Sequence, residues 1–440
     1  MADKTFGSST GLTILAENQA TPANGMVAYV TSSWNSGYQN GDIKGAFLSD
    51  TDDTDLTYTV LNNTTDYTTE WSQTEDGWTI NATSLVCDGL DGSEFVFTGS
   101  TNDLFGLPRG SAVVIKFEIT SYTSGNLFVD FSNGAGNNIG PFNSTGVYTV
   151  VGTVGGGIAN DTLYLRSDNF AGTIENIEIA AADADRSVNN NGLIVNGTVT
   201  RTPVATGADL VAYSGFSASN YLEQPYNADL DFGTGDFCVM GWVKDTVTAT
   251  DFYFDRMDVA RSGAEFGLLG IGNEFRFIAS SILDGTTANR DDGNWHHVVG
   301  VRRSGVAELY VDGVLNVSQA DTGDLDNASA VLVVGAASSK GSSASSASLA
   351  LLRISATAPT AEAIEKIYND EKHLFTEGAQ ATLFGASDAV TALAFDDSSQ
   401  LLHVGTSAGR SVFQGLRRVS NTTTAVGTAI SAANNLVVEE

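Results

Sequence analysis

The feature that most limits how this chain can fold is the alternation of apolar and polar residues within short segments that turn residues separate. Val113, Ile115, Phe117 and Ile119 occupy one face of the segment 113–120, and mostly polar residues occupy the other. A period of two is typical of a β-strand with one buried face. Gly, Thr, Ser, Asn and Asp are abundant along the chain, and most of these residue types favour turns. The chain is therefore predicted to be all-β.

The alternation predicts a first module over residues 56–185. It recurs around Leu127 and again around Leu163, with Gly-, Asn- and Ser-rich turns between the alternating segments. Short strands at this spacing are typical of a β-sandwich or jelly roll. We therefore expect one β-sandwich here.

A Gly- and Asn-rich connection over residues 186–205 leads to a second predicted module over residues 206–375. Residues 237–243 are apolar on both faces, which predicts a central strand of a two-layer sandwich. Asp312-Gly313 follows an alternating segment and is a strong signal for a two-residue hairpin. The chain thus carries two tandem β-sandwich (jelly-roll) modules in this interpretation.

One helix is expected to close the second module. Thr360 is a suitable N-cap directly after Pro359, and Ile364, Ile367 and Leu374 recur at helical spacing. We predict a helix over residues 361–374.

The two ends of the chain lack enough residues for cores of their own. Residues 1–55 are expected to form an arm that packs on something else. Residues 376–440 return to strand patterning at 390–395 and 401–406, and two further strands at 411–413 and 434–438 are expected to complete one small antiparallel sheet.

The predicted C-terminal sheet has open edges and no second layer, so its apolar residues need a partner. Closing three such sheets around an axis would bury these residues, which favours a homo-oligomer and in particular a trimer. Packing on the chain's own second module, or on a different protein, would bury them equally well.

Charge limits the partners of the chain. It carries 21 Lys and Arg residues against 52 Asp and Glu residues, a net charge of −31. Such a surface repels nucleic acid and anionic membranes, so we expect neither as a partner. No apolar stretch approaches the roughly 20 residues of a membrane-spanning helix, and the sequence opens without the apolar region of a signal peptide. Cys87 and Cys238 fall in different modules, which excludes a disulfide framework.

The second module resembles the laminin-G/concanavalin-like lectin family. In that family a Trp-His-His-Val strand and a Tyr-Val-Asp-Gly hairpin follow one another within a two-sheet jelly roll, here at residues 295–298 and 310–313. A helix that opens with Pro-Thr-Ala-Glu and contains Ile-Tyr commonly follows, here over residues 359–368. The resemblance implies a lectin-like fold and glycan binding.

Three further segments carry looser resemblances. The first module is similar to carbohydrate-binding-module jelly rolls at residues 71–78 and 169–177, and the tail resembles one WD-type propeller blade without its Trp-Asp pair. Residues 41–51 resemble the openings of structural and appendage proteins of tailed bacteriophages.

The phage resemblance implies a virion structural protein that is assembled in the host cytoplasm. It would be a fibre or spike whose N-terminal arm attaches to other virion proteins and whose sandwiches recognise host-surface glycan. The alternative is a non-catalytic capsid or tail decoration protein that binds other virion proteins only. A secreted bacterial adhesin is a third interpretation, which the missing signal peptide disfavours.

Catalysis is not expected. Concanavalin-like glucanases, which the resemblance brings in, use carboxylates that alternate on one strand to flank one glycosidic bond. No Glu-x-Asp-x-Glu pattern occurs between residues 206 and 358, and Asp229-Leu230-Asp231 lacks the third carboxylate. His296 and His297 cannot both serve one site, because neighbours on a strand point to opposite faces.

Calcium is the one candidate cofactor. Asp251, Asp255 and Asp258 cluster in the sequence, and loop carboxylates suit a hard cation. The alternative is solvated loop charge.

Sugar binding needs aromatic faces for stacking together with hydrogen-bonding side chains. The candidates are Trp71, Tyr122, Phe252 and Tyr253, with Trp78 also available. The alternative for each of them is a place in a sandwich core, where most aromatic residues of such folds lie.

Overall fold

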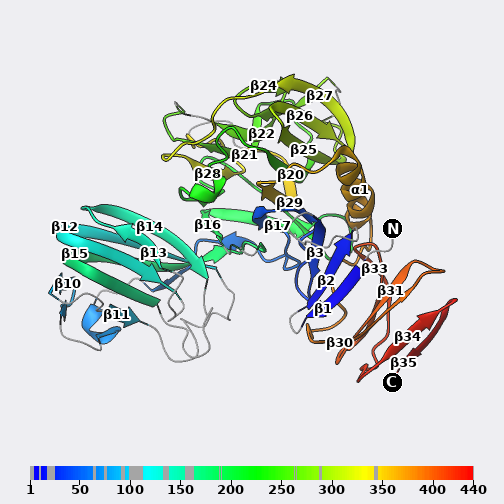
Figure 1. Cartoon of the computed structure of the whole chain (residues 1–440), viewed down its shortest axis with the longest axis horizontal. Helices are drawn as coiled ribbons and strands as arrows, with labels where there is room; N and C mark the ends of the chain where they lie inside the picture. Colours follow the sequence, from blue (N-terminus) through cyan, green and yellow to red (C-terminus); the bar gives the residue numbers. More distant parts are fainter. Residues whose placement is uncertain are drawn as a thin grey trace.

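The computed structural model describes residues 4–8, 11–16, 25–62, 66–73, 77–90, 95–98, 112–131, 138–153, 163–187, 189, 191–261, 263, 265–286, 290–340 and 345–439. Within these residues the strands form five sheets, which confirms the all-β prediction. The first module lies beside the second, and the small terminal sheets lie together at one end of the second module (Figure 1). No helix in the described residues is long and apolar enough to cross a membrane.

Two long antiparallel strands organise the first module, β12 (Ala112–Asp130) and β15 (Leu163–Asp183). The predicted inward residues Val113, Ile115 and Phe117 are fully buried in one apolar cluster, because they share one face of β12. Val114 on the opposite face is also buried, in a smaller cluster of its own. The shorter elements are β7 (Val60–Asn62), the turn η2 (Tyr67–Thr69), β8 (Trp71–Gln73), β9 (Trp78–Ile80), β10 (Leu85–Asp88), β11 (Phe95–Thr98), β13 (Ile139–Phe142) and β14 (Gly146–Thr153).

The second module is a sandwich of two antiparallel sheets, as predicted. The first sheet contains β16 (Leu193–Asn196), β19 (Tyr221–Gln224), β28 (Val331–Val334), β21 (Asp251–Met257), β22 (Phe266–Ile271), β23 (Glu274–Ile278) and β24 (Ile282–Asp284), with the turn η3 (Ala228–Leu230) after β19. The second contains β27 (Val314–Ala320), β26 (Val306–Val311), β25 (Trp295–Arg303), β20 (Phe237–Lys244), β29 (Ser348–Ser355), β18 (Val211–Ser214), β17 (Thr198–Pro203), β6 (Leu56–Thr57) and β5 (Ile43–Phe47).

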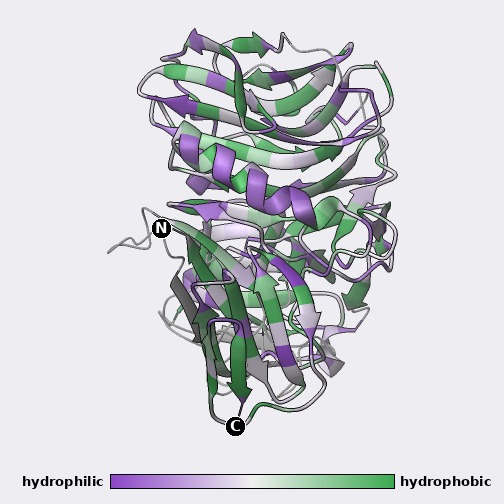
Figure 2. Ribbon diagram, turned by 90° about the vertical axis from the view of Figure 1, so that its right-hand side faces the viewer, coloured by the Kyte–Doolittle hydropathy of each residue, from purple (hydrophilic) through white to green (hydrophobic). Residues whose placement is uncertain are grey.

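Strand β20 is buried on both faces, which explains its unbroken apolar sequence. Phe237 and Val239 point into the core between the two sheets. Cys238, Met240 and Trp242 point the other way, into a second apolar cluster that includes helix α1 (Ala361–Glu371). The helix continues as the turn η4 (Lys372–Phe375), so the predicted helix over residues 361–374 is confirmed. Figure 2 shows α1 lying across the strands of this module with a largely hydrophilic outer surface.

The segment between the modules is itself strand. β16 pairs with the end of β15 in the first module and with β19 in the second, so one sheet runs through both modules. β17 pairs with β18 and with β6. Hydrogen bonds between strands, in addition to the covalent chain, therefore connect the two sandwiches.

The terminal segments pack on each other and on the second module. The N-terminal sheet is β1 (Lys4–Ser8), β2 (Gly11–Ala16), β3 (Met26–Val30) and β4 (Gln39–Asn40), and the C-terminal sheet is β30 (Val390–Asp396), β31 (Leu401–Thr406), β32 (Gly409–Gln414) and β33 (Arg417–Asn421). Leu12 and Ile14 share an apolar cluster with Val404, Phe413 and the inner face of α1. Of the apolar residues that motivated a trimer, Val404, Val412 and Phe413 are buried inside a single chain, and Val390, Leu393 and Phe395 are partly buried against the same cluster. Packing on the chain's own second module, one of the alternatives to a trimer, therefore covers most of them. The trimer stays a prediction without that support.

One C-terminal detail differs from the prediction. The last strand, β35 (Leu436–Glu439), pairs with β34 (Ile430–Ala433) in a separate two-stranded sheet and does not complete the β30–β33 sheet. The two asparagines between β34 and β35, Asn434 and Asn435, both have positive φ, which is the conformation of a tight hairpin turn. The chain therefore turns back on itself, and the hairpin contacts β30 through the Asn435 N–H, which donates to Asp396 Oδ2, without joining the β30–β33 sheet by strand pairing.

A buried ion pair connects the outer layer to the second module. Arg353 of β29 and Glu371 of α1 are almost completely buried and form a two-pronged pair, with Arg353 Nη2 3.0 Å from Glu371 Oε2. The Glu371 carboxylate also accepts hydrogen bonds from the Tyr38 backbone N–H at 2.7 Å and from Trp242 Nε1 at 2.8 Å. Four segments that are distant in sequence therefore meet at one carboxylate.

We expect Arg353→Met to destabilise the full-length chain by about 3–5 kcal/mol, because it leaves Glu371 buried without its counter-charge. Urea unfolding followed by tryptophan fluorescence measures the change. Lys366→Gln is the matched control, because its partner Asp370 lies on the helix surface and such pairs contribute less than about 1 kcal/mol. An Arg353→Met effect no larger than that of the control would contradict this role of the pair.

Candidate functional site

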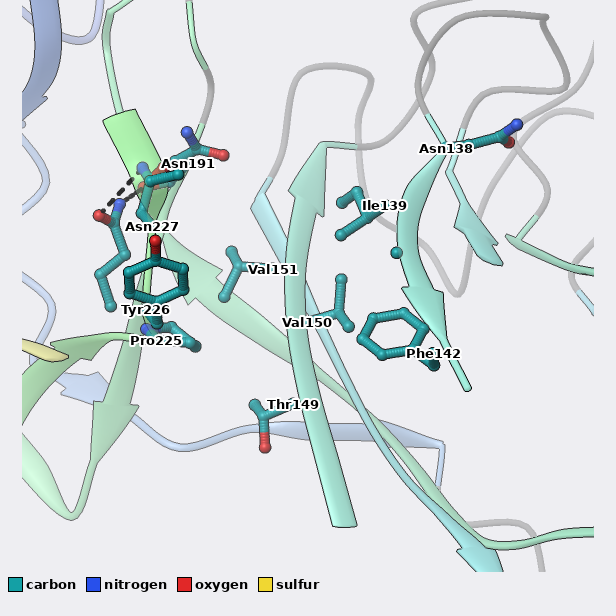
Figure 3. Close-up of a pocket in the computed structure, with 13 residues that line it drawn as sticks. Asn138, Ile139, Phe142, Thr149, Val150, Val151, Asn191, Pro225, Tyr226 and Asn227 are labelled. Atoms are coloured by element: carbon teal, nitrogen blue, oxygen red, sulfur yellow. Dashed lines mark hydrogen bonds between the residues drawn. The ribbon is translucent and has the colours of Figure 1, made fainter. Parts of the chain in front are cut away.

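A groove that residues of both modules line lies where the two modules meet. It has a volume of about 470 Å³, and strands β13 and β14 form one wall while the turn after β19 forms the other (Figure 3). Its lining residues are Asn138, Ile139, Gly140, Phe142, Thr149, Val150, Val151, Asn191, Gln224, Pro225, Tyr226, Asn227 and Ala228. A volume in this range suits a small organic ligand.

The turn after β19 holds an aromatic ring at the groove. Pro225 ends the strand, and the side chain of Asn227 accepts a hydrogen bond from the backbone N–H of Asp229 at 2.9 Å, which fixes the turn η3. The Tyr226 hydroxyl donates to Asp231 Oδ2 at 2.7 Å, and this hydrogen bond raises the pKa of Tyr226. Tyr226 is nevertheless 43% exposed. Its ring is therefore anchored at the hydroxyl and open to a ligand.

The lining is polar but uncharged. Four of its residues carry carboxamides, Asn138, Asn191, Gln224 and Asn227, and none carries a charge. Gln224 Nε2 donates to the backbone oxygen of Asn191 at 2.6 Å, which orients the Gln224 amide. In a chain with a net charge of −31, an uncharged lining favours a neutral ligand that offers hydroxyls.

The opposite wall is apolar. Phe142 packs edge-on against Phe117 at 5.3 Å between ring centroids and against Tyr148 at 4.8 Å, so its position is fixed from within the first module. Val150 and Val151 continue this wall along β14. In Figure 3 the Tyr226 ring and Val151 stand on facing sides of the groove.

The aromatic residues that the sequence suggested for sugar binding lie elsewhere. Trp71, Phe252 and Tyr253 are buried, and Tyr122 packs against Phe170 with its hydroxyl bonded to the Gly125 carbonyl at 3.1 Å. They lie in three different apolar clusters and do not form one surface. Tyr226 was not among the residues that the sequence suggested; its signal is an aromatic residue between Pro and Asn directly after a strand.

The three candidate calcium ligands are occupied by protein groups. Asp251 lies 3.3 Å from Arg290 Nη1, Asp255 lies 2.5 Å from Arg261 Nη1, and Asp258 accepts from the Gly263 N–H at 2.6 Å. Within the described residues no three His, Cys, Asp or Glu side chains converge as a metal site would require. The arrangement gives the calcium hypothesis no support.

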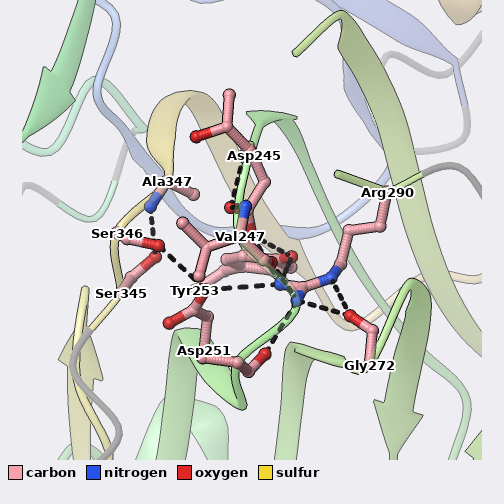
Figure 4. Close-up of polar contacts among 11 residues, drawn as sticks. Asp245, Val247, Asp251, Tyr253, Gly272, Arg290, Ser345, Ser346 and Ala347 are labelled. Atoms are coloured by element: carbon pink, nitrogen blue, oxygen red, sulfur yellow. Dashed lines mark hydrogen bonds and ion pairs between the residues drawn. The ribbon is translucent and has the colours of Figure 1, made fainter. Parts of the chain in front are cut away.

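Arg290 shows why Asp251 faces inward together with Asp245. Its guanidinium is fully buried and donates to Asp245, to the Tyr253 hydroxyl and to the carbonyls of Val247, Ala249 and Gly272 (Figure 4). Burial, followed by the negative charge of Asp245, raises the pKa of Asp251. The positive charge that balances these carboxylates therefore comes from an arginine of the chain itself.

The histidine pair lies on opposite faces of β25, as predicted. His296 Nδ1 lies 2.8 Å from Asp312 and Nε2 lies 3.2 Å from Asp292. His297 is buried beside Trp242 at 5.2 Å between ring centroids, and its ring nitrogens have no hydrogen-bond partner in the described residues. Burial, followed by the charge of Arg353, lowers the pKa of His297 well below its ordinary value.

Asp312, in the predicted hairpin turn, connects the turn to both histidines. Asp312 and Gly313 both have positive φ, 51° and 81°, which is the conformation expected of a two-residue hairpin turn. The Asp312 carboxylate also accepts from the His297 backbone N–H at 2.9 Å. The Trp-His-His-Val strand and the Tyr-Val-Asp-Gly hairpin thus form one structural unit.

Residues 216–365 match the family model of the concanavalin A-like lectin/glucanases superfamily. The match confirms the resemblance stated for the second module, and the groove residue Tyr226 lies inside it. No curated protein matches the sequence of the chain.

Several solved structures are similar to part of this chain. Domain 4 of an extracellular arabinanase from Geobacillus stearothermophilus, in complex with arabinotriose, is 18% identical with a TM-score of 0.32, and the match covers 42% of this chain and 92% of that one. The binding domain of Paraclostridial mosquitocidal protein 1 is 13% identical with a TM-score of 0.37, covering 52% and 62%. The botulinum neurotoxin serotype D ligand-binding domain, in complex with N-acetylneuraminic acid, is 16% identical with a TM-score of 0.34, covering 43% and 48%. The chain therefore spans less than two thirds of either toxin domain.

We expect His296 to stabilise the concanavalin-like module more at low pH than at high pH. Burial of its ring lowers the pKa, but the hydrogen bonds and negative charges of Asp312 and Asp292 outweigh this and raise it overall. A raised pKa in the folded state means that the contribution is complete below about pH 6.5 and is lost as the pH rises through the folded value.

The measurement is the difference in unfolding free energy between the natural chain and His296→Gln. Taking the difference removes the titration of other groups, such as Glu265, whose pKa burial and Asp255 raise to about 7. The difference should be larger at about pH 6 than at about pH 9. An equal difference at the two pH values would mean that His296 is not charged in the folded chain.

Proposed function

We propose that this chain is a lectin-like protein that binds a neutral oligosaccharide in the groove between its two modules. The observation that carries the proposal is the groove's uncharged lining, which combines the exposed ring of Tyr226 with four carboxamides. A sugar presents C–H groups on its ring faces and hydroxyls at its edges. An aromatic face packs against the first, and amide donors and acceptors bond the second. The family match of residues 216–365 supports the same class of function.

Binding without hydrolysis fits the groove best. Glycoside hydrolysis needs a pair of carboxyl groups on either side of the scissile bond, and no lining residue is an Asp or Glu. The nearby Asp231 is already engaged by Arg256 and by Tyr226. Its partial burial raises its pKa, but the hydrogen bonds from Tyr226, the Asn327 N–H and Arg256 lower it overall. This carboxylate is therefore held ionised behind the ring and cannot act as an acid.

The two walls of the groove are fixed relative to each other. β16 pairs with β15, which belongs to the first wall's module, and with β19, which leads directly into the Tyr226 turn. A groove that is already formed before binding saves the free energy of ordering its walls.

We further propose that this binding occurs on a bacteriophage particle, in a fibre or spike that contacts the host surface. The resemblance of residues 41–51 to tailed-phage proteins and the end-to-end lectin-like modules support this setting. Residues 1–55 would provide the attachment to other virion proteins.

Mass spectrometry of purified particles, with immunogold labelling, tests the setting. The proposal predicts that the chain is present on the particle and exposed. Its absence from purified particles would contradict the virion role but not glycan binding. Presence on the particle with no glycan binding would favour the decoration-protein alternative.

We expect Tyr226→Ala to weaken binding of a neutral oligosaccharide about tenfold or more, or about 1.4 kcal/mol, because it removes the stacking face. A glycan array with the full-length chain identifies the oligosaccharide, and calorimetry measures its affinity.

Tyr226→Phe is the matched control. It keeps the ring and loses only the hydroxyl, which bonds to Asp231 and not to the groove, so affinity should stay within a few-fold of the natural chain. Leu90→Ala, at an exposed apolar residue of the first module, controls for unspecific surface effects. Equal affinities of the Tyr226→Ala variant and the natural chain would remove the groove as the site.

A further inference from the structure

A second cavity lies on the outer face of the second module. Its volume is about 450 Å³, and strands β20 and β25, the end of helix α1 with η4, and residues 204–206 surround it. The side chains that distinguish it are Lys244, Trp295, Tyr368 and Lys372, and we call these four the lysine cleft. None of them lines the groove between the modules.

The two lysines are unusual in this chain. The chain has seven lysines against 52 Asp and Glu residues. Four lysines with described side chains form ion pairs, namely Lys44, Lys116, Lys340 and Lys366. Lys244 and Lys372 have no carboxylate within the 4.0 Å of an ion pair in the part of the chain that the structure describes. The Lys372 ammonium instead donates to Asn369 Oδ1 at 2.7 Å and lies 5.0 Å from the Tyr368 ring centroid.

Two ammonium groups without counter-ions therefore line one cavity of a strongly acidic protein. Because most other cations are neutralised within the chain, this cavity is a local site of positive potential. Glu377 also lines the cavity but is exposed at its edge. An anionic ligand would supply the missing charge through charge-assisted hydrogen bonds.

The aromatic residues give the cavity a rigid apolar floor. Phe375 stacks on Trp242 at 4.3 Å between ring centroids and contacts Trp295 at 4.8 Å. Trp295 Nε1 donates to the Val204 carbonyl at 2.9 Å, which fixes the orientation of the indole. Tyr368 lies parallel to Trp242 on the helix side. Partly exposed rings held in this way offer faces to the C–H groups of a sugar ring.

We propose that the lysine cleft binds a sugar that carries a carboxylate, such as a uronic or sialic acid residue of a glycan. The ammonium groups of Lys244 and Lys372 bind the carboxylate, and the rings of Trp295 and Tyr368 pack against the sugar ring. Asn294 and Thr206, which also line the cavity, offer hydrogen bonds to its hydroxyls. The cleft thus complements the uncharged groove with a second site of opposite preference, and it does not depend on that groove being a glycan site.

Calorimetry with the full-length chain tests the cleft. The probes are methyl glucuronoside and methyl N-acetylneuraminoside, with methyl glucoside as the neutral counterpart, and acetate and inorganic phosphate as anions without a sugar ring. At least one acidic sugar should bind about tenfold more tightly than methyl glucoside or acetate, with an affinity that falls as salt is added. Equal binding of acetate or phosphate would reduce the cleft to a simple anion site and overturn the proposal, as would equal binding of the neutral sugar.

Variants locate the binding. Lys244→Gln and Lys372→Gln should each weaken the acidic sugar about tenfold, because each removes one charge-assisted contact. Lys366→Gln, on the same helix but outside the cleft, should leave its affinity unchanged. Tyr226→Ala should also leave it unchanged, which separates failure of the cleft from failure of the groove. If Lys366→Gln weakens binding as much as the cleft variants do, the effect is one of overall charge and the proposal fails.

Discussion

The buried pair of Arg353 and Glu371 is the interaction on which the arrangement of the outer layer depends. Glu371 lies at the end of α1, and its carboxylate is bonded to Arg353 on β29, to Trp242 on β20 and to the backbone of Tyr38. The helix, the central strand and the N-terminal segment are therefore fixed at one point. The lysine cleft lies directly beside this point, because Trp242 lines the same cavity as Tyr368 and Lys372 of the cleft. Its shape follows from how α1 docks.

Strand pairing fixes the groove between the modules in the same way that the ion pair fixes the outer layer. β16 is short, but it hydrogen-bonds to both modules and makes one sheet of strands that belong to two cores. The groove lies where these cores meet, so each module contributes one wall. The molecule thus offers two cavities of different chemistry, one uncharged and one with unpaired lysines.

Local patterns in the sequence predicted the elements well and the contacts between them poorly. β12 and β20, the Asp312-Gly313 turn and helix α1 follow from periodicity, turn residues and capping, all of which act within a few residues. The arginine partner of Asp245 and Asp251 does not follow from such local patterns. Asp245 and Asp251 are 45 and 39 residues from Arg290 in the chain, and nothing local indicates that an arginine fills the place proposed for calcium. For the same reason, the sequence did not indicate the hydrogen bond from the Ser32 backbone N–H to Asp388, 356 residues away. This bond helps to join the two terminal segments.

Exposure was the other quantity that the sequence could not supply. Phe252 and Tyr253 are aromatic like Tyr226, yet they are buried, because β21 is covered on both faces and the turn after β19 is not.

The most direct test of the account is a crystal structure of the full-length chain with the neutral oligosaccharide that binds it best. The account predicts a sugar ring packed on Tyr226, with hydrogen bonds to the carboxamides of Gln224 or Asn227. A sugar bound elsewhere, with the groove empty, would contradict it.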